Sequence, residues 1–407
     1  MDIINLNNEA ILKYVLENGM IDLDTIQAQM DMRRKKELLE AHPYEPWYRE
    51  DTKKWYVYLP DEEKGRIRRE RKTKKEIEDV IVSYQKTKED NPTIKEVFNE
   101  WNDRRLELGK IKASTHSRNK QIFERHFSSM GRRRIRNVQP EEISDFLEEE
   151  IADKNLSAKA FSNLKTITKG FLKRAKKLKI ISYNVTELFD ELDVSDSTFK
   201  KRRKEDNEEV FTEEELPVIL NYLMENQNMY TLGLLLIFVT GIRSGELVAL
   251  KWEDFTGNSI KVGRSETRYK DSNGKMIYQV SEPKTYAGYR TVVIPKDYIW
   301  VMEKLRRYNP FTEYIFTDNK GERVHTYSFR TRLQTICDKT NCVRKSPHKI
   351  RKTYGSILLD NNIDNRLVIG QMGHTDILCT ENHYHRNRRN EITKQQIISS
   401  IPEFKAK

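Results

Sequence analysis

Apolar residues recur every three or four positions along most of the chain, which is the spacing of amphipathic helices. The pattern is densest at residues 91–183, where it predicts a bundle of about four helices. Asn91-Pro92-Thr93 marks the start, because Pro92 disfavours helical backbone at Asn91 and Thr93 can cap the next helix. The apolar stripes expected to form the core are Ile94, Val97, Phe98 and Trp101, then Ile122, Phe123 and Phe127, then Ile143, Phe146, Leu147 and Ile151, and finally Phe161, Leu164, Ile167, Phe171 and Leu172.

Residues 44–58 show a different pattern, with aromatic and β-branched residues on both sides of a polar break at 49–54. This pattern predicts a β-hairpin, and we expect its second strand to end at Pro60. A basic run follows at 64–75, and apolar residues then recur at helical spacing over 77–84. A small sheet backed by one helix, with basic residues on a strand, can enter a DNA groove. A solvated charged turn on a minor domain is the alternative for this run.

A polar, charged stretch at 193–206 has no periodicity and is typical of an inter-domain linker. After it, Thr212 and Glu215 have the spacing of a capping box at a helix start. An apolar run at 232–239 predicts a buried helix. Strand-like runs follow at 259–262, 275–280 and 290–294, with Asn273-Gly274 as the turn between the first two. Beyond Asp297 the pattern is helical again to the end.

The charge balance points to an acidic polymer as partner, since the net charge is +11 and the pI is about 9.2. A merely soluble basic protein is the alternative on charge alone. The length of 407 residues suggests two or three domains. Cys337, Cys342 and Cys379 are too sparse for a disulfide framework or a zinc site, and fit a reducing cytoplasm. The longest apolar run is too short to span a membrane, and the N-terminus predicts no signal peptide.

Candidate catalytic residues lie near the ends of the predicted helices in the second half. Arg243 follows the buried helix and Gly241, where a loop can present a guanidinium group to a pocket; a surface arginine is the alternative. Ser346-Pro347 predicts a helix start, with the serine as cap. His348 then falls in the first turn and Arg351 on the same face. The free amides and positive dipole of such a helix end attract an anion.

A further group of candidates follows Gly373, which we expect to end a helix over 365–372. His374 begins the segment that carries Tyr384, the last tyrosine of the chain. A single tyrosine on an amphipathic helix is usually half-buried core, so only the preceding residues give this one its meaning. Lys284 lies in the turn between the second and third strand-like runs, and only beside the other candidates is it a possible general acid. One phenol, two arginines and two histidines can break a phosphodiester without a metal ion.

The chain resembles tyrosine recombinases, in particular the integrases of phages and conjugative transposons. The resemblance covers the chain from about Val210 to the end, and more loosely a helical core-binding domain and an arm-type DNA-binding domain near residues 43–90. One departure is that Tyr384 lies ten residues after His374, where the family usually has nine. The residues that carry the catalytic signature, in order, are Arg243, Lys284, His348, Arg351, His374 and Tyr384.

The resemblance implies that Tyr384 attacks a phosphodiester, which leaves a 3′-phosphotyrosyl bond and a free 5′-hydroxyl. It implies no metal, no ATP and no other cofactor. Arg243 and Arg351 would hold the non-bridging oxygens, whose charge grows in the transition state. Lys284 would protonate the leaving 5′-oxygen.

The remaining roles are implied in the same way. His348 would accept the phenol proton or donate a hydrogen bond to the phosphate, and His374 would brace the phosphate. Glu246 is expected to orient Arg243. The apolar tail residues Ile392, Ile397, Ile398, Ile401 and Phe404 would pack on a neighbouring subunit, as in the family, or on their own domain.

The expected fold is a multidomain chain, mainly α with small β-sheets (α+β). Its expected parts are a helical extension at 1–42, an arm-type DNA-binding domain with a three-stranded sheet and a helix at 43–90, a helical core-binding (SAM-like) domain at 91–190, a linker at 191–207 and a mixed α/β catalytic domain at 208–407. Short helical patterns in the extension include residues 9–16. The residues expected to contact DNA are Arg66, Arg68, Arg69, Arg71, Lys72, Arg132, Arg133, Arg134, Lys173 and Lys177.

The implied partners are double-stranded DNA with core and arm attachment sites, three further copies of the chain in a tetramer on synapsed DNA, and an excisionase-type directionality factor. The expected location is the bacterial cytoplasm, on DNA and away from membranes. Two other functions stay open. A DNA-binding regulator would keep the fold without the chemistry, although it has no use for the phenol. A type IB topoisomerase shares the chemistry but needs no second DNA address. A metal-dependent nuclease would need a carboxylate cluster.

Overall fold

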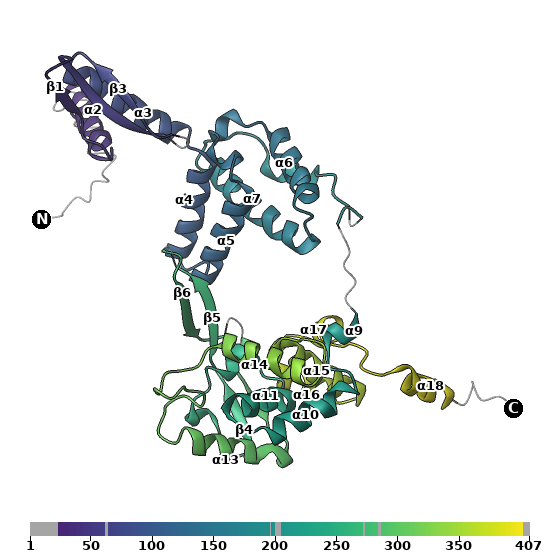
Figure 1. Ribbon diagram of the computed structural model, residues 1–407. Coiled ribbons are helices and arrows are strands. Elements are labelled where there is room, and N and C mark those ends of the chain that lie inside the picture. The colour runs from purple at the N-terminus through teal and green to yellow at the C-terminus, as the bar shows by residue number, and fades with distance from the viewer. Residues whose placement is uncertain are drawn as a thin grey trace, which may run out of the picture. The chain divides into compact units, whose positions relative to one another are not determined.

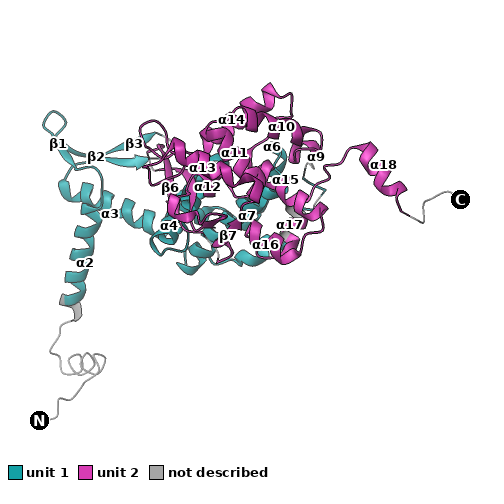
Figure 2. Ribbon diagram, turned by 90° about the horizontal axis from the view of Figure 1, so that it is seen from below, with its two compact units in different colours: residues 1–200 teal, residues 201–407 magenta. Residues whose placement is uncertain are grey.

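The computed structural model describes residues 23–61, 64–195, 197–199, 205–271, 273–283 and 286–401. The chain divides into two compact units, residues 1–200 and residues 201–407, which are coloured separately in Figure 2. Both are mainly helical with small antiparallel sheets (Figure 1), as the expected α+β class requires. The segment 9–16 lies outside the described residues, and the first described helix is α2 (Leu23–Glu40).

The first unit begins with a three-stranded antiparallel sheet in the order β1 (Trp47–Arg49), β2 (Lys54–Asp61), β3 (Gly65–Arg71). Helix α3 (Lys74–Asp90) packs on β2 and β3 through a small apolar core. The hairpin predicted around residues 49–54 is present, but the prediction that Pro60 ends its second strand is wrong. Pro60 lies inside β2, opposite Arg66 of β3. A proline fits there because β1 pairs only with the start of β2, so β2 is paired on one side alone at Pro60.

The rest of this unit is a bundle of α4 (Ile94–Glu107), α5 (Ala113–His126), α6 (Pro140–Asp153), α7 (Ala158–Lys177) and α8 (Val185–Asp190), with short 3₁₀ turns at Met130–Arg132 and Ile135–Asn137. Thr93 caps α4 as expected, because its hydroxyl accepts from the Glu96 amide while the Glu96 carboxylate accepts from the Thr93 amide. The predicted apolar stripes meet in one core. Gly170 is required there, since a Cβ atom would lie 2.2 Å from the Trp101 ring.

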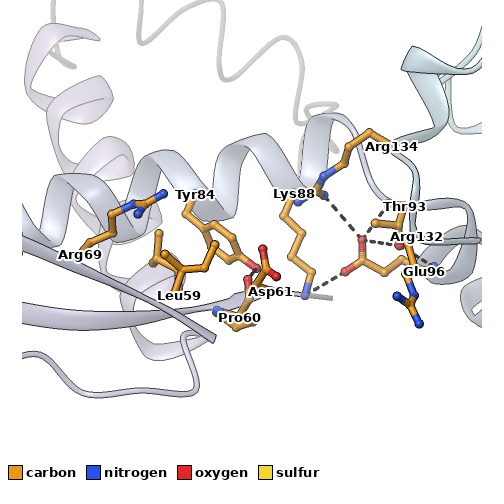
Figure 3. A pocket seen from close by; sticks show the side chains of 11 residues that line it. Leu59, Pro60, Asp61, Arg69, Tyr84, Lys88, Thr93, Glu96, Arg132 and Arg134 are labelled. Atoms are coloured by element: carbon orange, nitrogen blue, oxygen red, sulfur yellow. Dashed lines mark hydrogen bonds and ion pairs between the residues drawn. The ribbon is translucent and has the colours of Figure 1, made fainter. Parts of the chain in front are cut away.

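A cavity of about 580 Å³ lies within this unit, between the sheet with α3 and the start of the bundle (Figure 3). Glu96 is the central charge on its bundle side. Its carboxylate lies 3.1 Å from Nζ of Lys88 and 3.8 Å from Nη1 of Arg134. The ion pair of Glu96 with Lys88 therefore joins α3 to α4.

The second unit is built around α11 (Met229–Thr240), which packs against α10 (Glu215–Glu225), α12 (Ser244–Leu247), α13 (Ile299–Tyr308), α14 (Thr326–Lys339) and α15 (Pro347–Asp360). Most of α11 is buried, as its continuous apolar run predicts. Before it lies the short helix α9 (Asp206–Glu209), and after α15 follow α16 (Asn365–Met372), α17 (Ile377–His383) and α18 (Glu391–Ser399). The reciprocal hydrogen bonds of the Thr212–Glu215 capping box are both present.

The strands of this unit differ from the prediction. β4 (Ser259–Val262) pairs with β7 (Arg290–Val293), and β5 (Ser265–Lys270) pairs with β6 (Met276–Ser281). The turn at Gly274 therefore joins β6 to β5, a strand that was not predicted, rather than to β4. β5 has no apolar alternation, because its one buried position is Glu266, which is held by Arg323, His325 and Thr326.

The expectation of helix throughout the region beyond Asp297 is also wrong for one stretch. Residues 309–325 are irregular and contain isolated β-bridges from Tyr314 to Lys251 and from Thr317 to Arg323. Among the described residues, no helix has the length and apolar character that a bilayer crossing requires.

Candidate active site

Arg243 is positioned by the sharp end of the buried helix α11. Gly241 follows that helix with left-handed backbone angles, φ 65° and ψ 14°. A Cβ atom at Gly241 would lie 2.2 Å from Cδ1 of Tyr354, so only glycine fits. The chain then turns, and Arg243 becomes the residue that precedes α12. Its side chain stays 37% exposed, the position expected for a guanidinium presented to a pocket.

His348 and Arg351 lie on α15, which begins at Pro347 as the sequence predicts. The Ser346 side chain does not cap the helix, contrary to expectation. Arg351 is fully buried, and its Nη1 donates to the Gly241 carbonyl at 2.6 Å while its Nη2 donates to the Met372 carbonyl. Its Nε has no hydrogen-bond partner among the described residues. Arg351 thus binds the carbonyls at the ends of two helices, while its Nε group stays without a hydrogen-bond partner.

His374 follows α16, whose C-terminal cap is Gly373 with φ 60° and ψ 50°, as predicted. Nε2 of His374 lies 3.0 Å from Nη2 of Arg351, and Nδ1 lies 2.6 Å from Oγ1 of Thr380. Because an arginine can only donate, Nε2 must accept, and Nδ1 carries the proton that is donated to Thr380. The contacts therefore fix the tautomer of His374.

Tyr384 lies directly after α17 and is 8% exposed. Its ring centroid is 4.6 Å from that of His374 and 5.4 Å from that of His348, and the guanidinium carbon of Arg351 lies 5.5 Å from it. Ser356 of α15 donates its hydroxyl proton to the Tyr384 carbonyl at 2.9 Å. The ten-residue spacing from His374 therefore does not remove this tyrosine from the cluster.

The cluster has a strong effect on its own ionisation. Burial and the positive charge of Arg351 lower the pKa of His348 from 6.5 to about 4. Burial and the same arginine lower the pKa of His374 to about 3. Burial and the charge of Arg243 lower the pKa of Arg351 to about 10. At neutral pH the site therefore holds two neutral histidines beside charged arginines.

Glu246 contacts Arg243 as expected, and it also binds Arg290, a residue that the sequence did not single out. The Glu246 carboxylate accepts from Nη1 of Arg243 at 2.8 Å, and from Nη1 and Nη2 of Arg290 at 3.0 and 2.7 Å. Nε of Arg290 donates to the Gln371 carbonyl at 3.0 Å. Burial alone would raise the pKa of Glu246, but the hydrogen bonds and charge of Arg290 outweigh it and lower the pKa to about 2. Arg290 opens a strand and had no motif around it, so no sequence signal marked it.

The structure thus brings Arg243, His348, Arg351, His374 and Tyr384 together, whereas Lys284 lies outside the described residues. The α18 tail residues are not buried: Ile392 is 67% and Ile398 is 54% exposed. Phe404 lies outside the described residues.

The residues expected to contact DNA have different surroundings. Most of them are exposed on β3, on the following turn or on α7. Arg66 and Arg68 of β3 lie over the rings of Tyr58 and Tyr56, at 4.1 and 5.3 Å from the centroids. Arg133 is instead paired with Glu142 at 2.5 Å. The other exposed members of the set are Arg69, Arg71, Lys72, Arg132, Lys173 and Lys177, while Arg134 is half-buried beside Glu96.

Comparison with known sequences finds a family model and several relatives. Residues 209–391 match the model of the phage integrase family. A XerC-like tyrosine recombinase of Caldanaerobacter subterraneus subsp. tengcongensis is 29% identical over 196 residues, which cover 43% of this chain and 50% of the relative. A probable integrase of prophage ps2 in Lactococcus lactis subsp. lactis is 26% identical over 267 residues, which cover 58% and 68%. The chain spans about half the length of the XerC-like and XerD relatives that it matches.

Solved structures extend the likeness to the fold of most of the chain. The Tn1549 transposon integrase in complex with a circular intermediate DNA has a TM-score of 0.58 at 18% identity, and the match covers 76% of this chain and 99% of the other. A lambda integrase tetramer bound to a Holliday junction has a TM-score of 0.53 at 13% identity, with 85% and 96% covered. At these identities the likeness is one of fold. Residues 209–391 are therefore similar to the phage integrase family and to tyrosine recombinases, and most of the chain shares the fold of these integrases.

Proposed function

We propose that the protein is a site-specific DNA recombinase that cuts and rejoins strands through a 3′-phosphotyrosyl intermediate, and that it integrates and excises a mobile element. The observation that carries the proposal is the gathering of two histidines and a buried arginine around the Tyr384 ring. A phenol is a poor nucleophile at neutral pH, because its pKa is about 10. Neighbouring arginines stabilise the phenolate, and a neutral histidine can accept the phenol proton.

We assign the roles from these contacts. His348, neutral at pH 7, takes the phenol proton as the Tyr384 oxygen attacks phosphorus. The bond from phosphorus to the leaving 5′-oxygen breaks, and Lys284 supplies the proton for that oxygen. The negative charge that grows on the phosphate meets the partly exposed side chain of Arg243 and the Nε group of Arg351, which has no other partner among the described residues. The phosphotyrosyl bond conserves the energy for rejoining, so no nucleotide cofactor is required.

His374 has a different role in this assignment. It is neutral, and its contacts with Arg351 and Thr380 hold its ring against that of Tyr384. From there it braces the phosphate once DNA is bound. Glu246 joins Arg243 to Arg290 and so limits the rotation of the Arg243 fork.

We assign DNA recognition outside the active site to the first unit. The face of β3 that carries Arg66 and Arg68 combines guanidinium groups with tyrosine rings, and suits an arm-type site. The exposed lysines of α7 suit a core site. The exposed apolar residues of α18 suit packing on a second copy of the chain, as in a tetramer on synapsed DNA. An excisionase-type factor would set the direction.

A plasmid assay tests this function. The substrate carries two directly repeated copies of the DNA that flanks the gene, and the reaction contains EDTA. Wild type is expected to excise the intervening segment, and Tyr384→Phe is expected to bind without excising it. Relaxation of a supercoiled plasmid that lacks the flanking DNA would instead indicate a topoisomerase. Binding without any strand exchange, from either end of the element, would indicate a regulator.

A further inference from the structure

An acidic residue from the start of the second unit is bound to α15, the helix that carries His348 and Arg351. Glu209 is the last residue of α9 and is only 5% exposed. Its two carboxylate oxygens form ion pairs with the ammonium groups of Lys349 and Lys352, both on α15. Burial alone would raise the pKa of Glu209, but hydrogen bonds from the two lysines lower it to about 2. The carboxylate is therefore charged at neutral pH.

The two lysines are sequence neighbours of the candidate catalytic residues on α15. Lys349 directly follows His348, and Lys352 directly follows Arg351. Residues three apart lie on the same face of a helix, about 100° per residue round from their neighbours. One carboxylate thus spans the flank next to the face that carries His348 and Arg351. A group that binds both lysines fixes the rotation of the first turns of α15 about the helix axis, and also their position.

The position of Glu209 is itself fixed by the backbone that follows. The amide of Phe211 donates to Oγ1 of Thr353 at 2.8 Å, and that hydroxyl donates to the Lys349 carbonyl at 2.9 Å. Phe211 and Thr353 are both fully buried. Residues 209–211 therefore form a short strap, defined by these contacts, along the same flank of α15.

The helix that this strap holds carries more than two of the site's groups. Ser356 of α15 binds the Tyr384 carbonyl, and a Cβ atom at Gly355 would lie 3.4 Å from Cβ of Tyr384. A rotation of α15 would therefore move His348 and Arg351 and the support of Tyr384 together. We propose that Glu209 is a positioning residue for DNA cleavage, which holds α15 in the rotation that aligns His348 and Arg351 with Tyr384. The proposal rests on the recombinase function above.

The chain provides a matched control in the same region. Glu215 pairs with Lys345 at 2.7 Å, and the Lys345 side chain is fully buried. This pair is also a buried acid–base contact. Because Lys345 precedes α15, which begins at Pro347, the pair does not bind a side chain of that helix. Glu209→Gln and Glu215→Gln each remove one largely buried carboxylate charge that is paired with lysine, and should both lower the melting temperature. Only the first should change the geometry of the site.

The test is single-turnover formation of covalent protein–DNA product on nicked half-site DNA, measured across DNA concentrations. Glu209→Gln should lower the rate at saturating DNA by about ten- to a hundredfold, because small misplacements of catalytic groups are costly. The DNA concentration that gives half the maximal rate should be unchanged. Glu209→Asp should recover part of the rate, and Glu215→Gln should keep it within about twofold. A wild-type rate for Glu209→Gln, or an equal loss in both glutamine variants, would overturn the proposal.

A second readout does not depend on catalysis. Hydrogen–deuterium exchange of the DNA-free protein should be faster at residues 348–352 in Glu209→Gln than in Glu215→Gln. Unchanged exchange at these residues would refute the positioning role of Glu209. An inactive wild-type protein would instead count against the recombinase function alone, because the exchange measurement does not depend on cleavage. If Glu209→Gln does not fold, Lys352→Gln takes its place in both measurements. It removes one of the two contacts and leaves Glu209 paired with Lys349.

Discussion

Nη2 of Arg351 lies 3.0 Å from Nε2 of His374 at the buried centre of the site. The arginine must be the donor, so His374 is neutral and its proton lies on Nδ1, toward Thr380. Protonation of His374 would place two cations in contact, which explains why its pKa is lowered to about 3 by burial and by Arg351. The buried charge of Arg351 thus helps to lower the pKa of both His348 and His374.

The pH dependence of cleavage follows from these lowered pKa values. At subsaturating DNA, the rate reports the ionisation of the free protein. It should stay level as the pH falls through 6.5, the ordinary pKa of histidine, and should decline only near pH 4, where His348 becomes protonated. Single-turnover cleavage over this range is the measurement. A decline centred near pH 6.5 would show that His348 is not the base or is not buried as described.

Glu246 should contribute stability that depends on pH. Its folded pKa of about 2 lies below the ordinary 4.5, so this stability is present above 4.5 and is lost as the pH falls toward 2. The shift corresponds to about 3 kcal/mol. Urea unfolding of wild type and Glu246→Gln should therefore differ most near pH 7 and converge toward pH 3. Because both proteins keep the histidines, the difference isolates Glu246. A gap that does not narrow would contradict the assignment.

Gly241→Ala should be strongly destabilising. The new Cβ atom would lie 2.2 Å from the Tyr354 ring, in backbone of φ 65°, beside the carbonyl that binds Arg351. Gly257→Ala is the control, since Gly257 has φ 83° but nothing lies within 4 Å of its added Cβ atom. We expect about 1 kcal/mol of destabilisation for the control and at least about 2 kcal/mol more for Gly241→Ala. Equal losses in thermal unfolding would mean that the close contact with Tyr354 does not matter.

The proposed arm-site contacts predict a change in the salt dependence of DNA binding. Arg66→Ala with Arg68→Ala should lower the slope of log affinity against log salt by about 2, because each lost phosphate contact removes about one unit. Arg133→Ala is the control, since Arg133 already pairs with Glu142. Binding is measured by fluorescence anisotropy on long duplex DNA at several salt concentrations. An equal slope change in the control would place the contact elsewhere.

Much of the site was predictable because its residues stand beside helix ends. Gly241 and Gly373 end helices in left-handed backbone shortly before Arg243 and His374, and Pro347 begins the helix that carries His348 in its first turn, so the sequence marked all three positions. The predicted helices had long apolar stripes, and these became the two large cores. Local patterns therefore carried most of the information about the helical framework.

The features that the sequence did not predict all depend on tertiary contacts. β5 is polar because its buried residue is Glu266, which is compensated by Arg323 and His325 from distant positions. Arg290 and Glu209 gain their importance from partners 44 and 140 residues away. No local pattern indicates such pairs. The sequence around Pro60 predicts a strand end because the one-sided pairing of β2 is a property of the sheet and not of the strand.

The most direct test of the account is to trap the protein on DNA and find the modified residue. Wild type is incubated in EDTA with nicked half-site DNA from each end of the element, and the product is separated under denaturing conditions. After nuclease digestion, mass spectrometry should locate the nucleotide on Tyr384, and Tyr384→Phe should bind the same DNA without forming the product. Covalent product from Tyr384→Phe, or a nucleotide on another residue, would show that Tyr384 is not the nucleophile.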